Sequence, residues 1–394
     1  MMEAWGKIRL GDVCKTNMDS YSPKEEWNFV NYLDTGNITD NKIDSIQYID
    51  VKNEKLPSRA RRKVKKDSII YSTVRPNQRH FGIVKSQPEN FLVSTGFAVI
   101  DTDAQVLDAD FLYYLLTQAT LVEALHAIAE QSTSAYPSIK PSDIENLEIE
   151  IPDLATQKKI ADVLGSLDRK ITQNTEVNKN LLEQAQSIFT QEFLMLDRIP
   201  DGWQESSLLG IADYLNGLAM QKYRPKDDEQ GLPVLKIKEL RQGSCDFNSE
   251  LCSPSIKPEY IVHDGDVIFS WSGSLLVDLW CGGTCGLNQH LFKVTSSTYD
   301  KWFYYAWTNH HLQKFAAIAA DMATTMGHIK REELSKAEVL IPSQSDYDRI
   351  GGLLAPLYDL VIANRIENRK LASLRDELLP QLMSGQLDVS EVSL

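Results

Sequence analysis

The sequence predicts an α+β chain in which two globular domains are separated by two long helices. The helices are expected to form an antiparallel coiled-coil pair with an internal pseudo-two-fold repeat. Three observations lead to this prediction: a repeat at an offset of 190 residues, a heptad stripe in two equivalent segments, and short β-branched runs followed by a helical pattern in each globular part. At 394 residues, 42% of them hydrophobic, the chain is long enough for two or three domains.

The repeat is clearest between residues 151–190 and 341–380, where eight of 40 positions are identical without a gap. Ile151-Pro152, for example, recurs as Ile341-Pro342. The turn sequence Pro200-Asp201-Gly202 marks the start of the second copy. We therefore expect a first globular domain at 1–150, a central long helix at 151–199, a second globular domain at 200–340, and a distal long helix with a C-terminal tail at 341–394.

Each globular domain has a mixed α and β pattern. Runs rich in β-branched residues lie between Gly, Asn and Pro clusters at 67–74, 97–100, 266–271 and 291–294. A helical pattern follows at 111–130 and again at 302–320. Because strands and helices do not alternate regularly, we expect α+β rather than a doubly wound parallel sheet.

Residues 155–196 and 345–384 are predicted to be long helices, because apolar residues there alternate spacings of four and three. Such a stripe can pack on its own domain, but two equal stripes separated by a whole domain favour a helix–helix pair. Asn174 and Asn364 lie at the midpoints of the stripes, so an antiparallel pair should bring them together in a polar layer that fixes the register. The expected interface comprises Ile160, Leu164, Leu167, Ile171, Asn174, Asn178, Leu181, Ile350, Leu354, Leu357, Val361, Asn364, Asn368 and Leu371.

Gly165 and Pro356 are poor residues for a helix interior. Either the long helices begin near these residues, with Pro356 in the first turn, or both helices kink there.

Composition excludes several classes of protein. No stretch approaches the ~18 apolar residues of a membrane span, and the first residues lack a basic segment followed by an apolar run. We therefore expect a soluble, cytoplasmic protein. The sequence contains no Gly-rich phosphate loop and no nucleophile elbow, and the adjacent His310 and His311 should point apart on a helix. No catalytic residue, cofactor or metal is expected.

The cysteines leave one alternative open. Four of the five, namely Cys245, Cys252, Cys281 and Cys285, fall close together. Spacings of seven and four fit a zinc site poorly, because two close-spaced pairs are usual there. Reduced structural cysteines are the favoured interpretation, with zinc as the alternative.

The charge is unevenly distributed. The net charge is −14, yet residues 52–85 contain eleven basic side chains and two acidic ones, which is +9 locally and leaves −23 elsewhere. A charge run is often only a solvated face, but a basic segment is also what phosphate binding requires.

Loops rich in polar side chains follow equivalent strands in both copies. Arg, Asn and Gln can read guanine or adenine edges, and Ser and Thr hydroxyls suit phosphates; the same residues are also ordinary turn formers. Recurrence at equivalent places, beside the basic segment in the first copy, favours DNA contact. The candidate DNA-binding residues are Arg62, Lys63, Lys65, Ser72, Thr73, Arg75, Asn77, Gln78, Arg79, His80, Ser132, Thr133, Ser134, Tyr136, Lys140, Trp271, Ser272, Ser274, Thr324, Thr325, His328 and Lys330.

The whole chain resembles the specificity subunits of type I restriction-modification systems. The most specific parts of the resemblance are Ile151-Pro152 with Gln157–Ala161 and Leu167-Asp168, Pro200–Trp203, the loops 73–77 and 324–328, and Leu378–Gly385. The second copy departs from the pattern: Tyr358 stands where the first copy has Asp168, and Tyr347-Asp348 where it has Gln157-Lys158.

The resemblance implies a non-catalytic subunit with two target-recognition domains, each of which reads half of a bipartite double-stranded DNA target. It further implies that methyltransferase subunits dock on the chain and that a translocating restriction subunit joins them. Two alternatives remain at this stage: a duplicated coiled-coil scaffold without DNA contact, and an enzyme with an unrecognised site.

Overall fold

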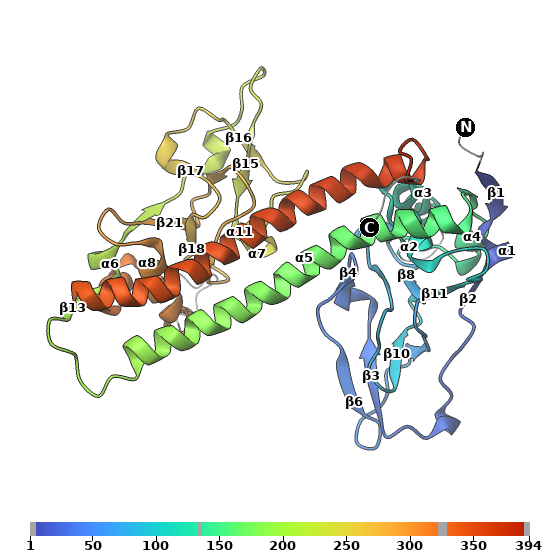
Figure 1. Cartoon of the computed structure of the whole chain (residues 1–394), viewed down its shortest axis with the longest axis horizontal. Coiled ribbons are helices and arrows are strands. Elements are labelled where there is room, and N and C mark those ends of the chain that lie inside the picture. Colours follow the sequence, from blue (N-terminus) through green and yellow to red (C-terminus); the bar gives the residue numbers. More distant parts are fainter. Residues whose placement is uncertain (1–4, 133–135, 322–328, 390–394) are drawn as a thin grey trace. The chain divides into compact units, whose positions relative to one another are not determined.

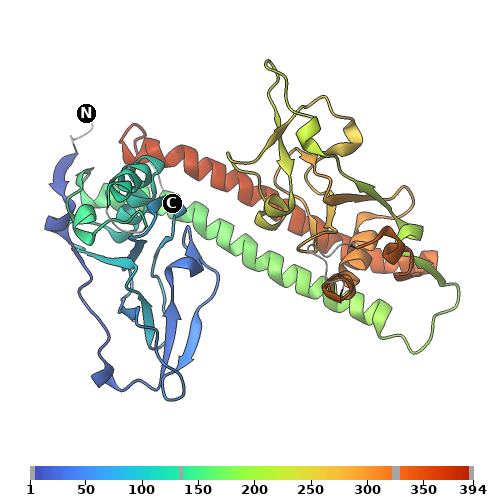
Figure 2. The ribbon, with the colours of Figure 1, turned by 180° about the vertical axis from the view of Figure 1, so that it is seen from behind.

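The computed structural model describes residues 5–132, 136–321 and 329–389, and it divides into two compact units. Unit 1 comprises Met1–Arg169 with Ser373–Leu394, and unit 2 comprises Lys170–Ala372. Each unit contains one globular module and part of each long helix, α5 (Leu154–Phe189) and α11 (Gln344–Met383), which Figure 1 and Figure 2 show from opposite sides.

Both long helices extend close to their predicted bounds, and α5 ends in a π-helical turn at Thr190–Leu194. Gly165 and Pro356 lie inside α5 and α11, so the alternative in which the helices begin at these residues is wrong. A proline in a helix interior costs about 3 kcal/mol. Leu354 and Tyr358, on either side of Pro356, are both buried in the core of unit 2. Tertiary packing of this kind is what maintains most protein helices against weak local propensity.

Unit 1 contains two four-stranded sheets and a two-stranded ladder. The first sheet is antiparallel throughout, in the order β2 (Cys14–Thr16), β11 (Phe97–Thr102), β8 (Ile69–Ser72), β9 (Phe81–Ile83). The second has the order β6 (Gln47–Asp50), β3 (Phe29–Leu33), β10 (Phe91–Ser94), β7 (Ala60–Arg62). The ladder pairs β1 (Gly6–Arg9) with β12 (Glu148–Ile151), and β4 (Ile38–Thr39) forms a hairpin with β5 (Lys42–Ile43).

Unit 2 repeats this topology. Its antiparallel sheet has the order β14 (Asp213–Asn216), β21 (Leu291–Thr295), β18 (Val267–Ser270), β19 (Leu276–Leu279). Its other sheet has the order β16 (Leu251–Cys252), β15 (Leu232–Leu235), β20 (Cys285–Leu287), β17 (Ile261–Val262). Its ladder pairs β13 (Gln204–Ser207) with β22 (Glu338–Ile341). The two modules therefore share one mixed helix and sheet fold, and the predicted strands near residues 70, 98, 268 and 292 are confirmed as β8, β11, β18 and β21.

One strand pair in each unit is parallel: β3 with β10, and β15 with β20. All other ladders of three or more paired residues in the described chain are antiparallel, which agrees with the expected α+β class.

Helices cover the antiparallel sheet of each unit. The predicted helical patches are each split in two: α2 (Ala109–Thr117) with α3 (Ala119–Glu130), and α8 (Lys301–His310) with α9 (Leu312–Asp321). Short helices complete the modules: α1 (Leu10–Val13), α4 (Pro141–Glu145), α6 (Leu208–Ile211), α7 (Ile237–Gln242) and α10 (Arg331–Ser335).

The long helices contribute to both cores. In unit 1, Ile160 and Leu164 of α5 and Leu382 of α11 belong to the same buried cluster as Phe111 of α2. In unit 2, Phe189 of α5 and Ile350 of α11 are buried together with the aromatic side chains of α8. Within the described residues no single helix is long and apolar enough to cross a membrane, and only α2 and α3 taken together, bent by 68°, meet that criterion.

Candidate nucleic-acid interface

In each copy a backbone hydrogen bond joins two segments that are far apart in sequence. One is the loop after β8 or β18, and the other is the segment just before the short helix α4 or α10. The amide of Ile139 donates to the carbonyl of Thr73 at 2.8 Å, and the amide of Ile329 donates to that of Trp271 at 3.0 Å. These bonds are equivalent under the repeat. In each module, residues more than 50 positions apart in sequence are therefore adjacent in the fold.

Five candidates lie outside the described residues, namely Thr133, Ser134, Thr324, Thr325 and His328.

Two arginines flank the 3₁₀ turn Pro76–Gln78 in the first copy, and both have left-handed backbones. The φ angle is 48° at Arg75 and 58° at Arg79. This conformation costs an L-residue about 1–2 kcal/mol relative to glycine, so each position must be held by its surroundings or retained for its side chain.

The two arginines have different roles. The Arg79 guanidinium donates to the Asp40 carboxylate at 2.7 Å and to the Thr117 carbonyl at 3.3 Å, and it covers the ring of Phe81. Arg75 is exposed, with its guanidinium 5.1 Å from the centroid of the exposed Tyr136 ring. Arg79 therefore ties the loop to the module, whereas Arg75 presents its charge to solvent.

Four other first-copy candidates form hydrogen bonds within the module. The Ser72 hydroxyl donates to the Val74 carbonyl, and the Thr73 hydroxyl donates to the Gly96 carbonyl. The His80 Nδ1 lies 2.6 Å from the Ile38 carbonyl oxygen. Ser132 accepts a bond from the Ser138 amide. The exposed candidates on this surface are Arg75, Asn77, Gln78, Tyr136 and Lys140.

The basic segment 52–85 is partly neutralised by carboxylates from elsewhere in the chain. Lys63 pairs with Glu25, Lys65 with Asp101, and Arg79 with Asp40, while Lys85 contacts both Asp67 and Asp110. The local count of +9 therefore overstates the free charge, because four of these five acids lie outside the segment in sequence.

The other seven basic groups form no salt bridge within the described part of the chain: Lys52, Lys55, Arg59, Arg61, Arg62, Lys66 and Arg75. Of these, Arg62 is turned inward. Its Nε is buried without a partner among the described residues, and burial lowers its pKa.

The second-copy loop is tied by side chains that the sequence did not single out. Trp271 Nε1 donates to Asn216 at 3.0 Å, and the buried Ser272 hydroxyl lies 3.2 Å from His290 Nδ1. Ser274 and Lys330 are exposed. Asn216 ends β14 and His290 lies in the turn before β21, so nothing in the sequence around Trp271 and Ser272 marks them as partners.

In unit 2, polar side chains join the two long helices. The Asn174 amide donates to Asn368 at 2.8 Å and to Glu367 at 2.6 Å, and the Asn364 amide donates to Asn178 at 2.9 Å. Residue numbers rise along one helix as they fall along the other. The expectation that Asn174 meets Asn364 is thus wrong by one helical turn: each meets the second asparagine of the opposite stripe, because the pseudo-two-fold axis passes between these two layers.

The remaining stripe residues fall into three groups. Ile160 and Leu164 pack in the core of unit 1, and Ile350 and Leu354 in the core of unit 2, so the ends of both stripes serve their own modules. Val361 is fully buried. The others are half-buried: Leu167, Ile171, Leu181, Leu357 and Leu371.

A polar cluster in unit 1 was missed by sequence reasoning. The Asp168 carboxylate accepts from the Tyr114 hydroxyl and from Arg375, each at 2.7 Å. Applying the repeat offset to Asp168 and Arg375 gives Tyr358 and Ala185, which are both buried in the core of unit 2. The departure at Tyr358 is therefore compensated: an ion pair in one copy is replaced by an aromatic residue and a small residue in the other.

The cysteines are all free thiols. A hydrogen bond with Cys285 holds the pKa of Cys245 below its ordinary value. Among the described residues, no group of three or more His, Cys, Asp or Glu side chains is placed to hold a metal ion.

Comparison with known proteins gives a consistent result. The type I restriction enzyme HindI specificity subunit of Haemophilus influenzae is 22% identical over 468 residues, which cover 98% of this chain and 100% of the relative. The MjaIX specificity subunit of Methanocaldococcus jannaschii is 27% identical over 72% of this chain and 70% of its own length. The crystal structure of a type I restriction-modification S subunit from M. genitalium has the same fold, with a TM-score of 0.56 at 14% identity over 96% of each chain. The profile of the type I restriction modification DNA specificity domain matches residues 2–184 and 200–374, so the chain belongs to this family.

Proposed function

We propose that this chain is the non-catalytic DNA-sequence-recognition subunit of a type I restriction-modification complex. Each module reads one half of a bipartite target. The observation that carries this proposal is the equivalent pair of loops, joined by the same backbone hydrogen bond in both copies but bearing different side chains. A shared frame with different loops is what two different half-sites require, so the target is asymmetric.

Within the first module, we assign DNA contact to the exposed residues Arg75, Asn77, Gln78, Tyr136 and Lys140. Arg75 is the strongest candidate for a base contact, because a guanidinium can bond two acceptors of guanine at once. Ser72, Thr73, Arg79 and His80 shape the loop instead. In the second module, Ser274 and Lys330 remain candidates together with the loop at 323–328.

The domain organisation follows the repeat, with target-recognition domains at 1–150 and 200–340. The helices at 151–199 and 341–394 form an antiparallel coiled-coil pair that sets the separation of the two half-sites. The layers Asn174–Asn368 and Asn178–Asn364 support this assignment, because buried polar layers select one register over its alternatives.

The partners are double-stranded DNA, methyltransferase subunits that dock on this chain, and a restriction or translocase subunit that joins through them. The chain needs no cofactor of its own, and we expect the complex in the cytoplasm. An acidic surface outside the reading loops is compatible with DNA binding, because the partner subunits supply part of the contacts to the DNA phosphates.

A domain exchange tests the proposal. Residues 1–150 are replaced by the equivalent domain of a relative, and the methylated sites are mapped with the methyltransferase present. One half-site should change while the other is kept. A change in both halves, or in neither, would contradict modular readout.

A further inference from the structure

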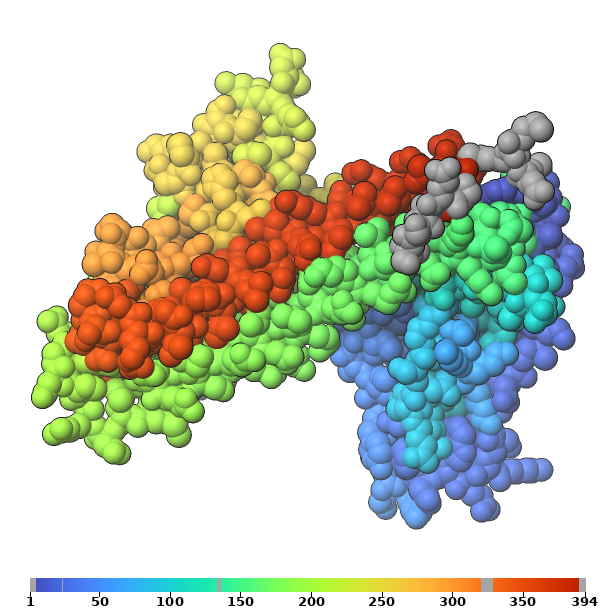
Figure 3. All heavy atoms as spheres, viewed as in Figure 1, coloured from blue at the N-terminus to red at the C-terminus, as the bar shows by residue number. Residues whose placement is uncertain are grey.

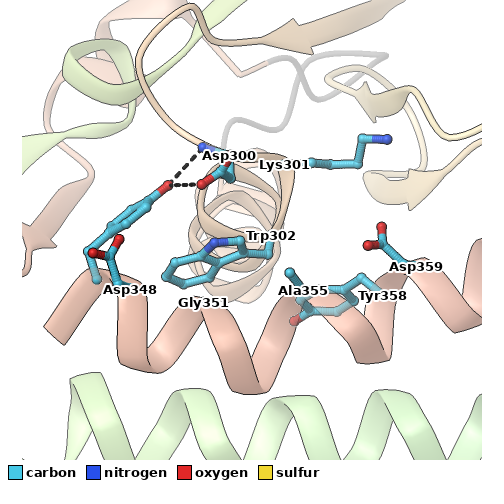
Figure 4. Close-up of a pocket in the computed structure, with 9 residues that line it drawn as sticks. Asp300, Lys301, Trp302, Asp348, Gly351, Ala355, Tyr358 and Asp359 are labelled. Carbon is cyan, nitrogen blue, oxygen red and sulfur yellow. Dashed lines mark hydrogen bonds between the residues drawn. The ribbon is translucent and has the colours of Figure 1, made fainter. Parts of the chain in front are cut away.

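A pocket of about 430 Å³ lies in unit 2 where the start of α8 meets α11. Figure 4 shows its floor, formed by Trp302 and Tyr358. Tyr347 also lines the pocket. Trp302 and Tyr358 are buried, with exposed fractions of 3% and 6%. The volume falls within the range of pockets that bind small groups.

Carboxylates surround this aromatic floor. Asp300, Asp348 and Asp359 line the pocket, against one amine, that of Lys301. All three aspartates are exposed, and Asp359 forms no hydrogen bond or salt bridge with any described residue. Asp300 accepts a bond from the Tyr347 hydroxyl at 3.2 Å, which orients that ring beside the pocket.

One donor that lines the pocket has no partner among the described residues. The indole N–H of Trp302 forms no hydrogen bond with them, although Trp302 as a whole is only 3% exposed. This N–H group is therefore available to a polar group that enters the pocket.

The equivalent place in copy one has the opposite charges. Lys158 and Arg169 stand where copy two has Asp348 and Asp359, and Asp110 stands where it has Lys301. In copy one Gln157 replaces Tyr347 and is fully buried, with bonds to the Asp108 amide and two carbonyls. The acidic residues that line the pocket in the second copy are thus not repeated at the equivalent positions of the first copy, and Tyr347 and Asp348, two of the departures from the repeat, both line it.

We propose that this pocket binds an arginine side chain of a partner polypeptide, and that the partner is a methyltransferase subunit; the identity of the partner rests on the proposed function. A guanidinium is planar, stacks on aromatic rings and bonds carboxylates. Three carboxylates disfavour DNA here, because they repel phosphates. Charge inversion between the copies restricts this contact to the second module, so the two modules present different docking faces to their partners.

The first test uses the full chain and its methyltransferase. Asp348→Lys with Asp359→Arg gives α11 the charges of copy one and should lower the affinity at least about tenfold. The control, Glu176→Lys with Glu183→Arg, makes the same charge change at exposed positions of α5 and should have little effect. Thermal unfolding and DNA binding of both variants confirm that the fold is kept.

The second test needs no partner subunit. Acetyl-arginine methylamide and its neutral isostere acetyl-citrulline methylamide are each titrated into the full chain, and saturation-transfer NMR detects contact. The arginine probe alone should bind, and the double substitution in α11 should abolish its signal.

Equal signals from the two probes would overturn the proposal. An α11 variant that keeps its methyltransferase affinity would also overturn it, as would an equal loss of affinity in the α11 variant and the α5 control. If the unsubstituted chain captures no methyltransferase, the proposed function itself fails, which is visible before any variant is compared.

Discussion

Replacing Arg75 by glycine should separate DNA binding from stability. The left-handed backbone at this position costs an L-residue ~1–2 kcal/mol, which glycine relieves. Glycine itself loses ~0.5–1 kcal/mol through chain entropy, and loss of the cation–π contact with Tyr136 costs a further ~0.5–1 kcal/mol at an exposed site. These contributions nearly cancel, so the free energy of unfolding should change by less than about 1 kcal/mol.

DNA binding by the same variant should weaken by about 1–3 kcal/mol, or about five- to 150-fold, if the guanidinium reads a base. Binding is measured by gel shift with the methyltransferase present, at several salt concentrations. A contact to phosphate would instead give a loss that is uniform across sequences and a shallower salt dependence.

Arg79→Gly is the matched control, because it relieves the same backbone strain beside the same turn. It also removes the ion pair with Asp40 and the bond to the Thr117 carbonyl. Because the backbone relief is the same in both variants, Arg79→Gly should be less stable than Arg75→Gly by about 1–2 kcal/mol. Wild-type DNA affinity in Arg75→Gly, or a stability loss as large as that of Arg79→Gly, would refute the different roles given to these arginines.

Further predictions concern the helices. The double variant Asp168→Tyr with Arg375→Ala carries the residues that copy two has at these positions. It should lose less stability than the two single variants together, with a coupling energy of about 1–2 kcal/mol measured by hydrogen exchange in unit 1. If the two losses simply add, the copy-two residues do not compensate for the lost ion pair. Arg369 bonds to both oxygens of Asp264 and lowers its pKa below the ordinary 3.8, so the stabilisation it gives unit 2 is present above that pH and lost as pH falls through the depressed pKa. Asp264→Asn should flatten this part of the acid unfolding curve, and an unchanged slope would contradict the assignment. Adding seven residues to both helices preserves the heptad pattern and lengthens each helix by about 10 Å. In a methylation assay the variant should then accept a DNA spacer that is longer by about three base pairs. An unchanged spacer in an active variant would contradict the idea that helix length sets the distance between the half-sites.

Much of the fold could be predicted from the sequence, because periodicity and repetition are local properties. The heptad stripes predicted the positions of α5 and α11. The internal repeat showed which elements of the first copy correspond to those of the second. The parallel pairs β3–β10 and β15–β20 could not be predicted, since strands of three to five residues have no local mark of their partner or direction.

The candidate site was less predictable, because partners across the fold decide what each side chain does. Arg75 and Arg79 have similar sequence surroundings. The distant Asp40, 39 residues from Arg79, distinguishes them, because it accepts a hydrogen bond from Arg79. The count of charges in 52–85 likewise could not include carboxylates supplied by other strands. The asparagine pairs were predicted one helical turn away from their true partners, because the midpoint of each heptad stripe does not by itself locate the pseudo-two-fold axis.

The asparagine pairs also determine where such a chain can be cut and rejoined. Asn174–Asn368, Asn178–Asn364 and Asp168–Arg375 each join a residue of the first copy to one of the second. A chimaera whose junction precedes Leu154 inherits both members of every pair from one parent. A junction near residue 195 instead takes one member from each parent, so mismatched layers accumulate along the whole seam. Reading domains can therefore be exchanged at the first junction without disturbing these pairs, provided that the incoming domain keeps the contacts of Phe111 and Tyr114 with α5. Whole halves are interchangeable only between parents whose helices already match.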